Sequence, residues 1–471
     1  MPAQTTDTPK FYQKRFMPMR HARLIPLLLA LAVPANGLAE TFERQLANGL
    51  RVIVKEDHRA PTAAHMVWYR AGSMDETNGS TGVAHVLEHM MFKGTPSAGP
   101  GEFNRRVAAA GGRDNAFTSR DYTAYFQQVP KQKLSEMMQL EADRMRHLTL
   151  DPREFAQEIK VVMEERRLRT DDQPQSLLFE QLTAVAFQTH PYRVPIIGWM
   201  NDLEHLAPAD ARRWYERWYA PNNAYVVVVG DLDHQVVFEL AEEHYGPLEA
   251  RPLPVRKPQD EPPQLGIRRL TVKAPADLPV VMMAYKAPVI RDVDQDVDPY
   301  ALEMLAAVLA GHDAARFSRH LVRQQRLAVV ASASYDSTAR GPGIFYLHGS
   351  PSEGRTAAEL EAGLRAEIAD VQQHGVAADE LARAKAQLIA GQIYKRDSIF
   401  AQAMEIGQLE AVGIPHALNR RMIDKLQEVT AEQIRVVAAK YFRDEQLTVA
   451  QLDPQPLPLA SRPASPSTAR H

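Results

Sequence analysis

The chain of 471 residues contains no cysteine. This absence excludes disulfide bonds, zinc sites built on thiolates and a cysteine nucleophile. Any metal ion must therefore be held by histidine, aspartate or glutamate. An excess of one charge is also missing, because 55 Lys and Arg face 58 Asp and Glu and leave a formal net charge of −3. The sequence has no excess of basic residues of the kind that would indicate a nucleic-acid partner.

Long apolar runs are missing too, apart from about ten residues between Leu24 and Val33, which are too few to span a bilayer. Basic residues precede this run and a small-residue stretch ending at Ala39 follows it, which is the order of a secretory signal peptide. We predict a signal peptide at residues 1–39, with Met17 or Met19 as alternative starts to Met1. We expect export, to the periplasm of a Gram-negative bacterium, with no membrane span after cleavage.

With 45% hydrophobic and 24% charged residues, the remainder is typical of a soluble globular enzyme with at least two domains. Proline is concentrated in residues 251–266, which we predict to be a linker. The predicted domains are residues 40–250 and 267–453. Residues 454–471 are rich in Pro and Ser and are predicted to be a disordered tail.

The second predicted domain repeats patterns of the first. A helix followed by a buried strand at residues 207–233 parallels residues 429–453, and residues 154–170 parallel residues 380–396. The predicted fold class is α+β, with two homologous α/β domains that each pack helices on an antiparallel-rich sheet.

The run His85-Val86-Leu87-Glu88-His89 is the main chemical signal. Helical positions i and i+4 share a face, so both imidazoles can point at one ion, and Glu88 leans toward the same side. A carboxylate beside a metal-activated water can serve as a base. The order His-x-x-Glu-His reverses the commoner zinc-protease order and is typical of inverzincins.

In a chain with 16 histidines, this pattern can also arise by chance. Two observations favour a metal site. Apolar residues flank both histidines, which predicts an inward-facing helix that ends at Gly94. A third ligand is available downstream, where Glu164 and Glu165 are adjacent.

Three further motifs extend the pattern. They are Gly82 to Thr95 around the His-x-x-Glu-His helix, Asn115-Ala116 with Thr118, Asp121, Thr123 and Tyr125, and His190-Pro191-Tyr192 with Pro195 and Gly198. Through these motifs the sequence resembles the pitrilysin/insulysin family of zinc metallopeptidases. It is closer to the half-length subgroup of mitochondrial processing peptidase and its bacterial periplasmic relatives, over residues 41–453.

The resemblance implies one zinc ion per chain, held by His85, His89 and a glutamate 75 to 77 residues beyond the second histidine. Glu165 fits that spacing better than Glu164, since 165 − 89 = 76. It implies that Glu158 orients a metal ligand without binding the metal itself, and that Glu88 is the general base. It also places Asn115 and Ala116 on an edge strand that pairs with a peptide substrate.

In the second domain, the counterpart of the metal helix is predicted at residues 300–311, which lack histidine. Glu165 and Glu158 align there with Gly391 and Ala384. In the family, a C-terminal copy supplies an arginine and a tyrosine seven residues apart that contact the substrate. Here Val329 stands where that tyrosine is expected, and Arg323 lies one residue off the spacing.

Either this strand only packs the domain, or a partner chain supplies the missing pair. We predict the latter, with a homologous subunit in a heterodimer and a homodimer as the alternative. The predicted function is a zinc metalloendopeptidase acting on peptides or unfolded segments. The alternatives are a non-catalytic structural or assembly subunit of the same fold and a zinc hydrolase of non-peptide amides.

Overall fold

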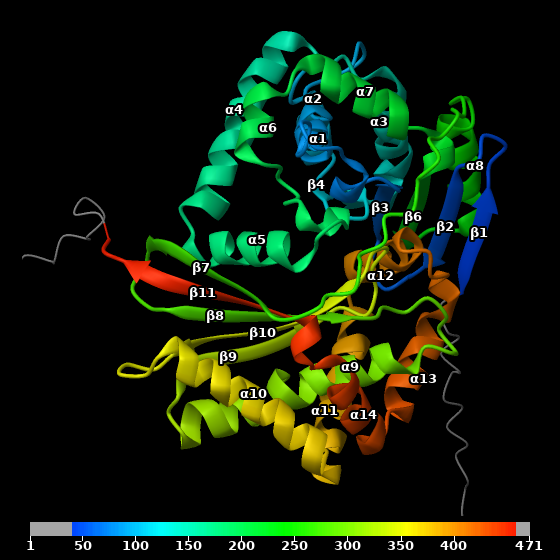
Figure 1. Cartoon of the computed structure of the whole chain (residues 1–471). Coiled ribbons are helices and arrows are strands. Elements are labelled where there is room, and N and C mark those ends of the chain that lie inside the picture. The colour runs from blue at the N-terminus through cyan, green and yellow to red at the C-terminus, as the bar shows by residue number, and fades with distance from the viewer. Residues whose placement is uncertain (1–39, 458–471) are drawn as a thin grey trace, which may run out of the picture. The chain divides into compact units, whose positions relative to one another are not determined.

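The computed structural model describes residues 40–457 (Figure 1). The predicted signal peptide and most of the predicted tail lie outside these residues. Two sheets organise the described chain. The first has the strand order β1-β2-β6-β3-β5-β4, and the second has the order β7-β11-β8-β10-β9.

The strands of the first sheet are β1 (Thr41–Gln45), β2 (Arg51–Glu56), β3 (Thr62–Tyr69), β4 (Arg113–Thr118), β5 (Thr123–Pro130) and β6 (Ala224–Gly230). Those of the second are β7 (Arg268–Pro275), β8 (Val280–Ala287), β9 (Ala328–Tyr335), β10 (Gly343–Pro351) and β11 (Leu447–Gln455). The turn between β1 and β2 uses Asn48 and Gly49, and Gly49 has a φ of 88°, which costs little without a Cβ.

Both halves contain helices between their strands. The first half has α1 (Val83–Met90), α2 (Glu102–Ala109), α3 (Leu134–His147), α4 (Pro152–Arg166), α5 (Pro174–Ala186), α6 (Met200–His205), α7 (Pro208–Trp218) and α8 (His234–Tyr245). The second has α9 (Val297–Ala310), α10 (Ala357–His374), α11 (Ala378–Lys395), α12 (Ile399–Ala411), α13 (Asn419–Glu428) and α14 (Ala431–Tyr441). A π-helical segment, Arg167–Asp171, continues α4.

The two halves are copies of one topology. The order β2-β6-β3-β5-β4 recurs as β7-β11-β8-β10-β9, and β6 is parallel to β2 as β11 is to β7. Helix α9 lies between β8 and β9 in the chain, as α1 lies between β3 and β4. The prediction of two homologous domains that mix helices with antiparallel-rich sheets is confirmed.

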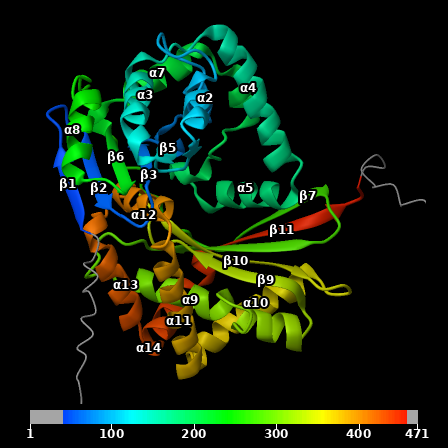
Figure 2. The ribbon, with the colours of Figure 1, turned by 180° about the vertical axis from the view of Figure 1, so that it is seen from behind.

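One helix of each half packs against the sheet of the other half. Leu178, Leu182 and Ala186 of α5 are buried against the second sheet, beside Val280 and Leu452. Ala403 and Ile406 of α12 are buried against the first sheet, in a cluster that includes Met66, Trp68 and Tyr225. Figure 2 shows α12 against the first sheet and α5 along the second. Because helices cover the first sheet on two faces, its inner strand β6 is an apolar run that is buried throughout.

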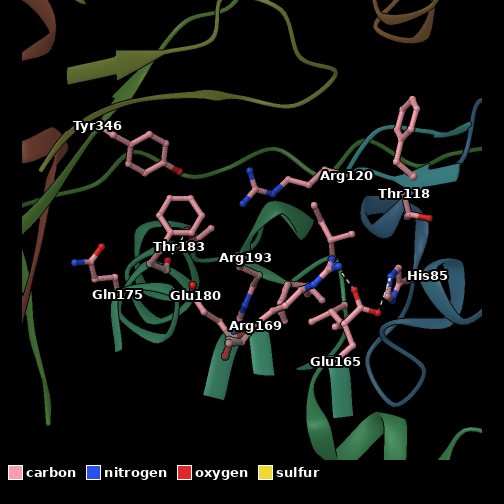
Figure 3. A pocket seen from close by; sticks show the side chains of 18 of the residues that line it. His85, Thr118, Arg120, Glu165, Arg169, Gln175, Glu180, Thr183, Arg193 and Tyr346 are labelled. Atoms are coloured by element: carbon pink, nitrogen blue, oxygen red, sulfur yellow. Dashed lines mark hydrogen bonds and ion pairs between the residues drawn. The ribbon is translucent and has the colours of Figure 1, made fainter. Parts of the chain in front are cut away.

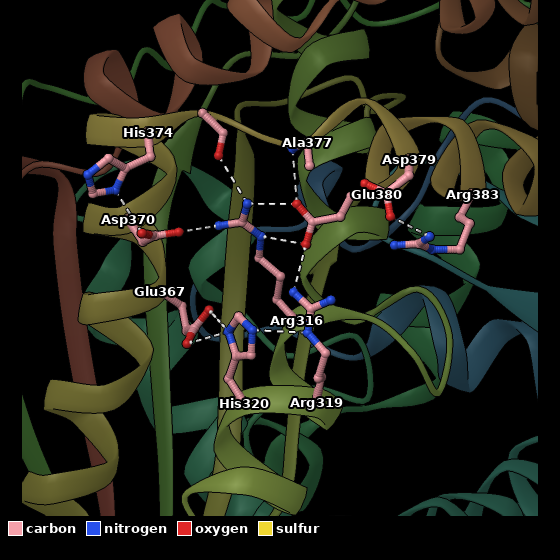
Figure 4. A network of polar contacts seen from close by, with 11 residues as sticks. Arg316, Arg319, His320, Glu367, Asp370, His374, Ala377, Asp379, Glu380 and Arg383 are labelled. Carbon is pink, nitrogen blue, oxygen red and sulfur yellow. Dashed lines mark hydrogen bonds and ion pairs between the residues drawn. The ribbon is translucent and has the colours of Figure 1, made fainter.

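A polar network ties the second half together (Figure 4). The buried guanidinium of Arg316 donates to Glu380 at 2.8 Å, to Asp370 at 2.7 Å and to the carbonyl of Gly375 at 3.0 Å. Arg316 thereby joins the segment after α9 to the end of α10 and the start of α11. An arginine and carboxylates paired in this way satisfy most of each other's hydrogen-bonding capacity inside the protein.

None of the helices between residues 40 and 457 combines the length and apolar character needed to cross a bilayer.

Candidate metal centre

Helix α1 starts where the backbone at Gly82 passes close to the backbone at Ile197 and Gly198. Gly82 precedes it with a φ of 86°, and a Cβ there would lie 2.5 Å from the carbonyl oxygen of Ile197. The Glu76 carboxylate accepts from the backbone N–H of Gly82 at 2.8 Å and of Ala84 at 2.9 Å. Glu76 thus caps the start of the helix by accepting from two of its first N–H groups, and burial raises the pKa of Glu76 to about 8. The start of the helix, and with it the direction of the histidines, is fixed by these contacts.

The structure brings His85, His89 and Glu165 together, with one donor atom from each within 4.8 Å of the others. Glu165 Oε2 lies 3.4 Å from His89 Nε2 and 3.8 Å from His85 Nε2. Ligand atoms around a tetrahedral zinc ion lie about 3.3 Å apart, given bonds of about 2.0–2.1 Å. Two imidazole nitrogens and a carboxylate oxygen at this spacing fit zinc.

The neighbouring Glu164 lies elsewhere. It is exposed and pairs with Arg167 at 3.1 Å on the outer face of α4. The two glutamates are adjacent in sequence, and a helix turns about 100° per residue, so only one of them can face α1. That residue is Glu165, which Figure 3 shows beside His85.

Each of two site residues is held by a charged neighbour. Glu158 accepts from His89 Nδ1 at 2.8 Å and from Lys93 Nζ at 2.5 Å, which leaves Nε2 of His89 facing Glu165. Arg169 forms an ion pair with Oε1 of Glu165 at 2.6 Å, and Oε2 of Glu165 faces the histidines. Outer partners of this kind fix the orientation of metal ligands.

Glu88 lies beside this cluster and is only 8% exposed. Burial raises the pKa of Glu88, although a hydrogen bond from Thr118 Oγ1 at 2.6 Å opposes the shift. Burial also lowers the pKa of His85 to about 3, so its ring is neutral at physiological pH, as a metal ligand must be. Burial disfavours the charged ring of His89 too, but the hydrogen bond with Glu158 and the negative charges of Glu88, Glu158 and Glu165 together outweigh burial and raise the pKa of His89.

The cluster opens into a cavity of about 1020 Å³. One wall is β4, the edge strand of the first sheet, with Asn115 and Ala116 on the cavity lining. The backbone N–H of Ala116 donates to Oδ1 of Asn115 at 2.9 Å. Since β4 pairs only with β5 among the described residues, this strand has an open hydrogen-bonding edge beside Glu88.

Several cavity residues were not predicted from the sequence. Arg169 could have been found, because it stands four residues after Glu165 on the same helical face. Met282, Ser334, Tyr346 and His348 line the cavity from the second sheet, more than a hundred residues from the motif. No local pattern connects those residues to His85.

The second half keeps the carboxylate and replaces the histidines. Tyr300, Glu303 and Met304 of α9 have the spacing of His85, Glu88 and His89. Glu303 accepts from Ser337 Oγ at 2.9 Å just beyond β9, as Glu88 accepts from Thr118 at the end of β4. Tyrosine and methionine in place of two imidazoles, with Gly391 in the predicted place of Glu165, leave no three-ligand set there.

Arg323 and Val329 stand near the positions of the family's substrate-contacting arginine and tyrosine, and both lie away from the cavity. Arg323 is exposed, and Val329 on the edge strand β9 is 57% exposed. Neither residue lines the cavity around His85. The prediction that a partner supplies the missing arginine and tyrosine stays a prediction.

Comparison with known proteins agrees with this architecture. The family model described as Insulinase (Peptidase family M16) matches residues 51–198, and the model described as Peptidase M16 inactive domain matches residues 205–388. The second match begins upstream of the predicted linker, so the predicted domain boundaries stay a prediction.

Among curated relatives, the zinc protease PqqE of Helicobacter pylori is 32% identical over 422 residues, which cover 87% of this chain and 92% of that protein. The mitochondrial-processing peptidase subunit beta of Lentinula edodes is 25% identical over 413 residues, covering 86% of this chain and 88% of that one. The crystal structure of a protease from Helicobacter pylori superposes with a TM-score of 0.84 at 29% identity. It covers 88% of this chain and 100% of that chain. The chain belongs to peptidase family M16, in the subgroup of half-length zinc proteases and processing-peptidase beta subunits.

Proposed function

We propose that this protein is a zinc-dependent endopeptidase that cleaves peptides or unfolded segments. The observation that carries the proposal is the convergence of His85, His89 and Glu165 in one cavity with a buried Glu88 beside them. The family membership supports a peptidase in general terms. The assignment of the metal, the ligands and the base rests on this geometry.

His85, His89 and Glu165 would hold one zinc ion per chain. When bound, zinc lowers the pKa of a water molecule to about 7 and polarises a peptide carbonyl. Glu88 takes the proton from the attacking water and delivers it to the leaving amine nitrogen. Its raised pKa suits both steps, because a group whose pKa lies closer to neutrality both accepts and returns a proton near pH 7. Thr118 orients the carboxylate through Oε2.

The peptide is held by main-chain pairing with β4. An extended segment that adds a strand to an open edge gains backbone hydrogen bonds with little demand on sequence. Asn115 and Ala116 are the proposed pairing residues, and the substrate displaces the Asn115 side chain from the Ala116 N–H. A single extended chain fits a cavity of about 1020 Å³, whereas a folded domain does not.

The decisive experiment separates metal binding from turnover. In Glu88→Gln, zinc should remain stoichiometric because no ligand has changed, while peptide hydrolysis should fall by about 10² or more. The matched control is Glu164→Gln, which makes the same chemical change on the outer face of α4 and should keep both properties. Near-normal hydrolysis in Glu88→Gln would remove Glu88 as the base.

The same assay tests the two rival functions. A non-catalytic subunit of this fold would cleave no peptide, either by itself or with a homologous partner that lacks the His-x-x-Glu-His motif. A hydrolase of non-peptide amides would turn over small amides and leave peptides intact. The presence of Glu88 and of the three donor residues His85, His89 and Glu165 in one site favours the peptidase over the non-catalytic subunit.

We also propose a heterodimer with a homologous subunit that supplies the missing arginine and tyrosine, with a homodimer as the alternative. The exposed Val329 on the edge strand β9 supports this assembly, since the chain offers no tyrosine at that position. Export to the periplasm is proposed from the signal-peptide pattern in residues 1–39.

A further inference from the structure

The charged side chains that line the cavity are equal in number but differ in how they are paired. Three carboxylates line it, namely Glu88, Glu165 and Glu180, and three arginines line it, namely Arg120, Arg169 and Arg193. Glu88 and Glu165 belong to the proposed metal centre. Glu180 is neutralised by Arg166, which stands behind it and donates to both carboxylate oxygens at 2.8 and 2.9 Å. No acidic side chain of the lining is therefore left to attract a basic substrate.

The three arginines differ in whether their guanidinium groups have a carboxylate or another hydrogen-bond acceptor as a partner. Arg169 is paired with Glu165 at 2.6 Å. Arg193 donates to the backbone carbonyl of Gln188 at 2.9 Å and has no carboxylate within 4.0 Å among residues 40–457. Arg120 has neither a carboxylate partner nor any side-chain hydrogen bond within the described chain, and its Nε is buried without a partner.

Arg120 is nevertheless held in place. Its guanidinium lies over the ring of Tyr192, with 5.4 Å between the guanidinium carbon and the ring centroid. Figure 3 shows the guanidinium projecting into the cavity from the side opposite Arg169 and Arg193. A cation that is oriented by an aromatic ring and lacks a hydrogen-bond acceptor is prepared to receive an anionic group.

The position of Arg120 relates it to the proposed peptide path. Arg120 stands in the turn that follows β4, two residues beyond Thr118, and Thr118 contacts the proposed base. Strands rise about 3.3 Å per residue, so a peptide along β4 reaches Arg120 about two residues from the scissile bond. A side chain at that distance can place a carboxylate on the guanidinium.

We propose that the cavity selects peptides that carry an acidic side chain within about two or three residues of the scissile bond, with Arg120 as the anchor and Arg193 as a second cation. This inference rests on the proposed peptidase function and names its substrate class. Arg120 acts on specificity and does not take part in bond cleavage.

The test is a series of internally quenched peptides that differ at one position, occupied by Glu, Gln or Lys. That position is moved through three residues on each side of the scissile bond, and mass spectrometry confirms the cleavage site. At the contacting position, kcat/KM should be about tenfold to a hundredfold higher for Glu than for Gln, and lower still for Lys. Arg120→Gln should abolish the preference for Glu over Gln, and Arg120→Glu should favour Lys.

The control is Arg153→Gln on α4, where the side chain is 90% exposed and outside the cavity. This variant should keep the full preference. Arg193→Gln should reduce the preference partly, and it provides a second variant if Arg120→Gln does not fold. Equal rates for Glu and Lys peptides in the wild type, or a preference that survives both cavity variants, would overturn the inference.

Binding separates this inference from the proposed function. The zinc-loaded Glu88→Gln protein is titrated into fluorescent Glu and Lys peptides, and anisotropy reports affinity without turnover. Tighter binding of the Glu peptide that depends on Arg120 supports the inference even if no peptide is hydrolysed. Hydrolysis of all peptides with equal binding refutes the charge selection and leaves the peptidase intact.

Discussion

Gly407 lies at the contact between the halves and gives a prediction whose sign depends on packing. This residue is in the interior of α12, the helix of the second half that packs against the first sheet. In an exposed helix, changing glycine to alanine stabilises a protein by about 1 kcal/mol. At Gly407, however, an added Cβ would lie 2.1 Å from Cε2 and 2.2 Å from Cζ2 of Trp68.

Neither partner can easily move away. Trp68 is 0% exposed and is packed against Tyr225 at 6.0 Å and Tyr122 at 4.9 Å between ring centroids. The helix is also tied to the sheet, because Tyr225 Oη donates to the carbonyl of Gly407 at 2.6 Å. Carbon atoms in contact need about 3.5–4.0 Å, so the helix or the ring must shift by about 1.5 Å.

The expected balance is unfavourable. Overpacking of this kind costs about 3 kcal/mol, and losing the Tyr225 hydrogen bond adds about 1 kcal/mol. Against a gain of about 1 kcal/mol in helix propensity, Gly407→Ala should lower the free energy of unfolding by about 3 kcal/mol. Equilibrium urea unfolding of the zinc-loaded protein, followed by circular dichroism, measures the change.

Gly391 is the matched control. It lies inside α11, and nothing is within 4 Å of a Cβ built there. Gly391→Ala should therefore raise the free energy of unfolding by up to about 1 kcal/mol. A Gly407→Ala protein as stable as the wild type, or equal shifts for both variants, would show that α12 does not pack on Trp68 as described.

Further predictions concern the ligand, the pH dependence and the assembly. Glu165→Gln should lose bound zinc by elemental analysis while Glu164→Gln keeps it, and the reverse result would exchange their roles. Burial alone would raise the pKa of Glu410, but hydrogen bonds from His416 and Arg51 hold it at about 2. Glu410→Gln should therefore cost about 2 kcal/mol at pH 7. Because a lowered folded-state pKa stabilises only above the unfolded value, the difference should shrink as pH falls from about 4.5 toward 2, and a constant difference in urea midpoints would contradict this. The isolated chain should hydrolyse peptides weakly and gain at least about a hundredfold with a homologous subunit carrying the arginine and tyrosine. Light scattering should then show about two chains per complex, and full activity from a strict monomer would refute the assembly.

Local features of this protein follow from the sequence alone. The spacing of His85, Glu88 and His89 places all three on one side of a single helix, because that geometry depends only on the helical period. The turn at Asn48-Gly49, the buried run of β6 and the repeat of a helix and strand in both halves are likewise local. The spacing implied by the resemblance favoured Glu165 over Glu164, although the helical period alone does not say which of two adjacent glutamates faces the histidines.

Tertiary packing decided the rest. The orientation of α4 against α1 turned Glu165 inward and Glu164 outward, and the end of β4 placed Thr118 on Glu88. The exchange of α5 and α12 between the halves brought β8, β9 and β10 to the cavity wall. Whether an arginine has a carboxylate partner depends on residues that are distant in the chain. Only the tertiary structure therefore shows that the guanidinium of Arg120 has no acceptor among the described residues. Sequence periodicity reports which face of an element is apolar, whereas the partner of that face is set by how the elements pack.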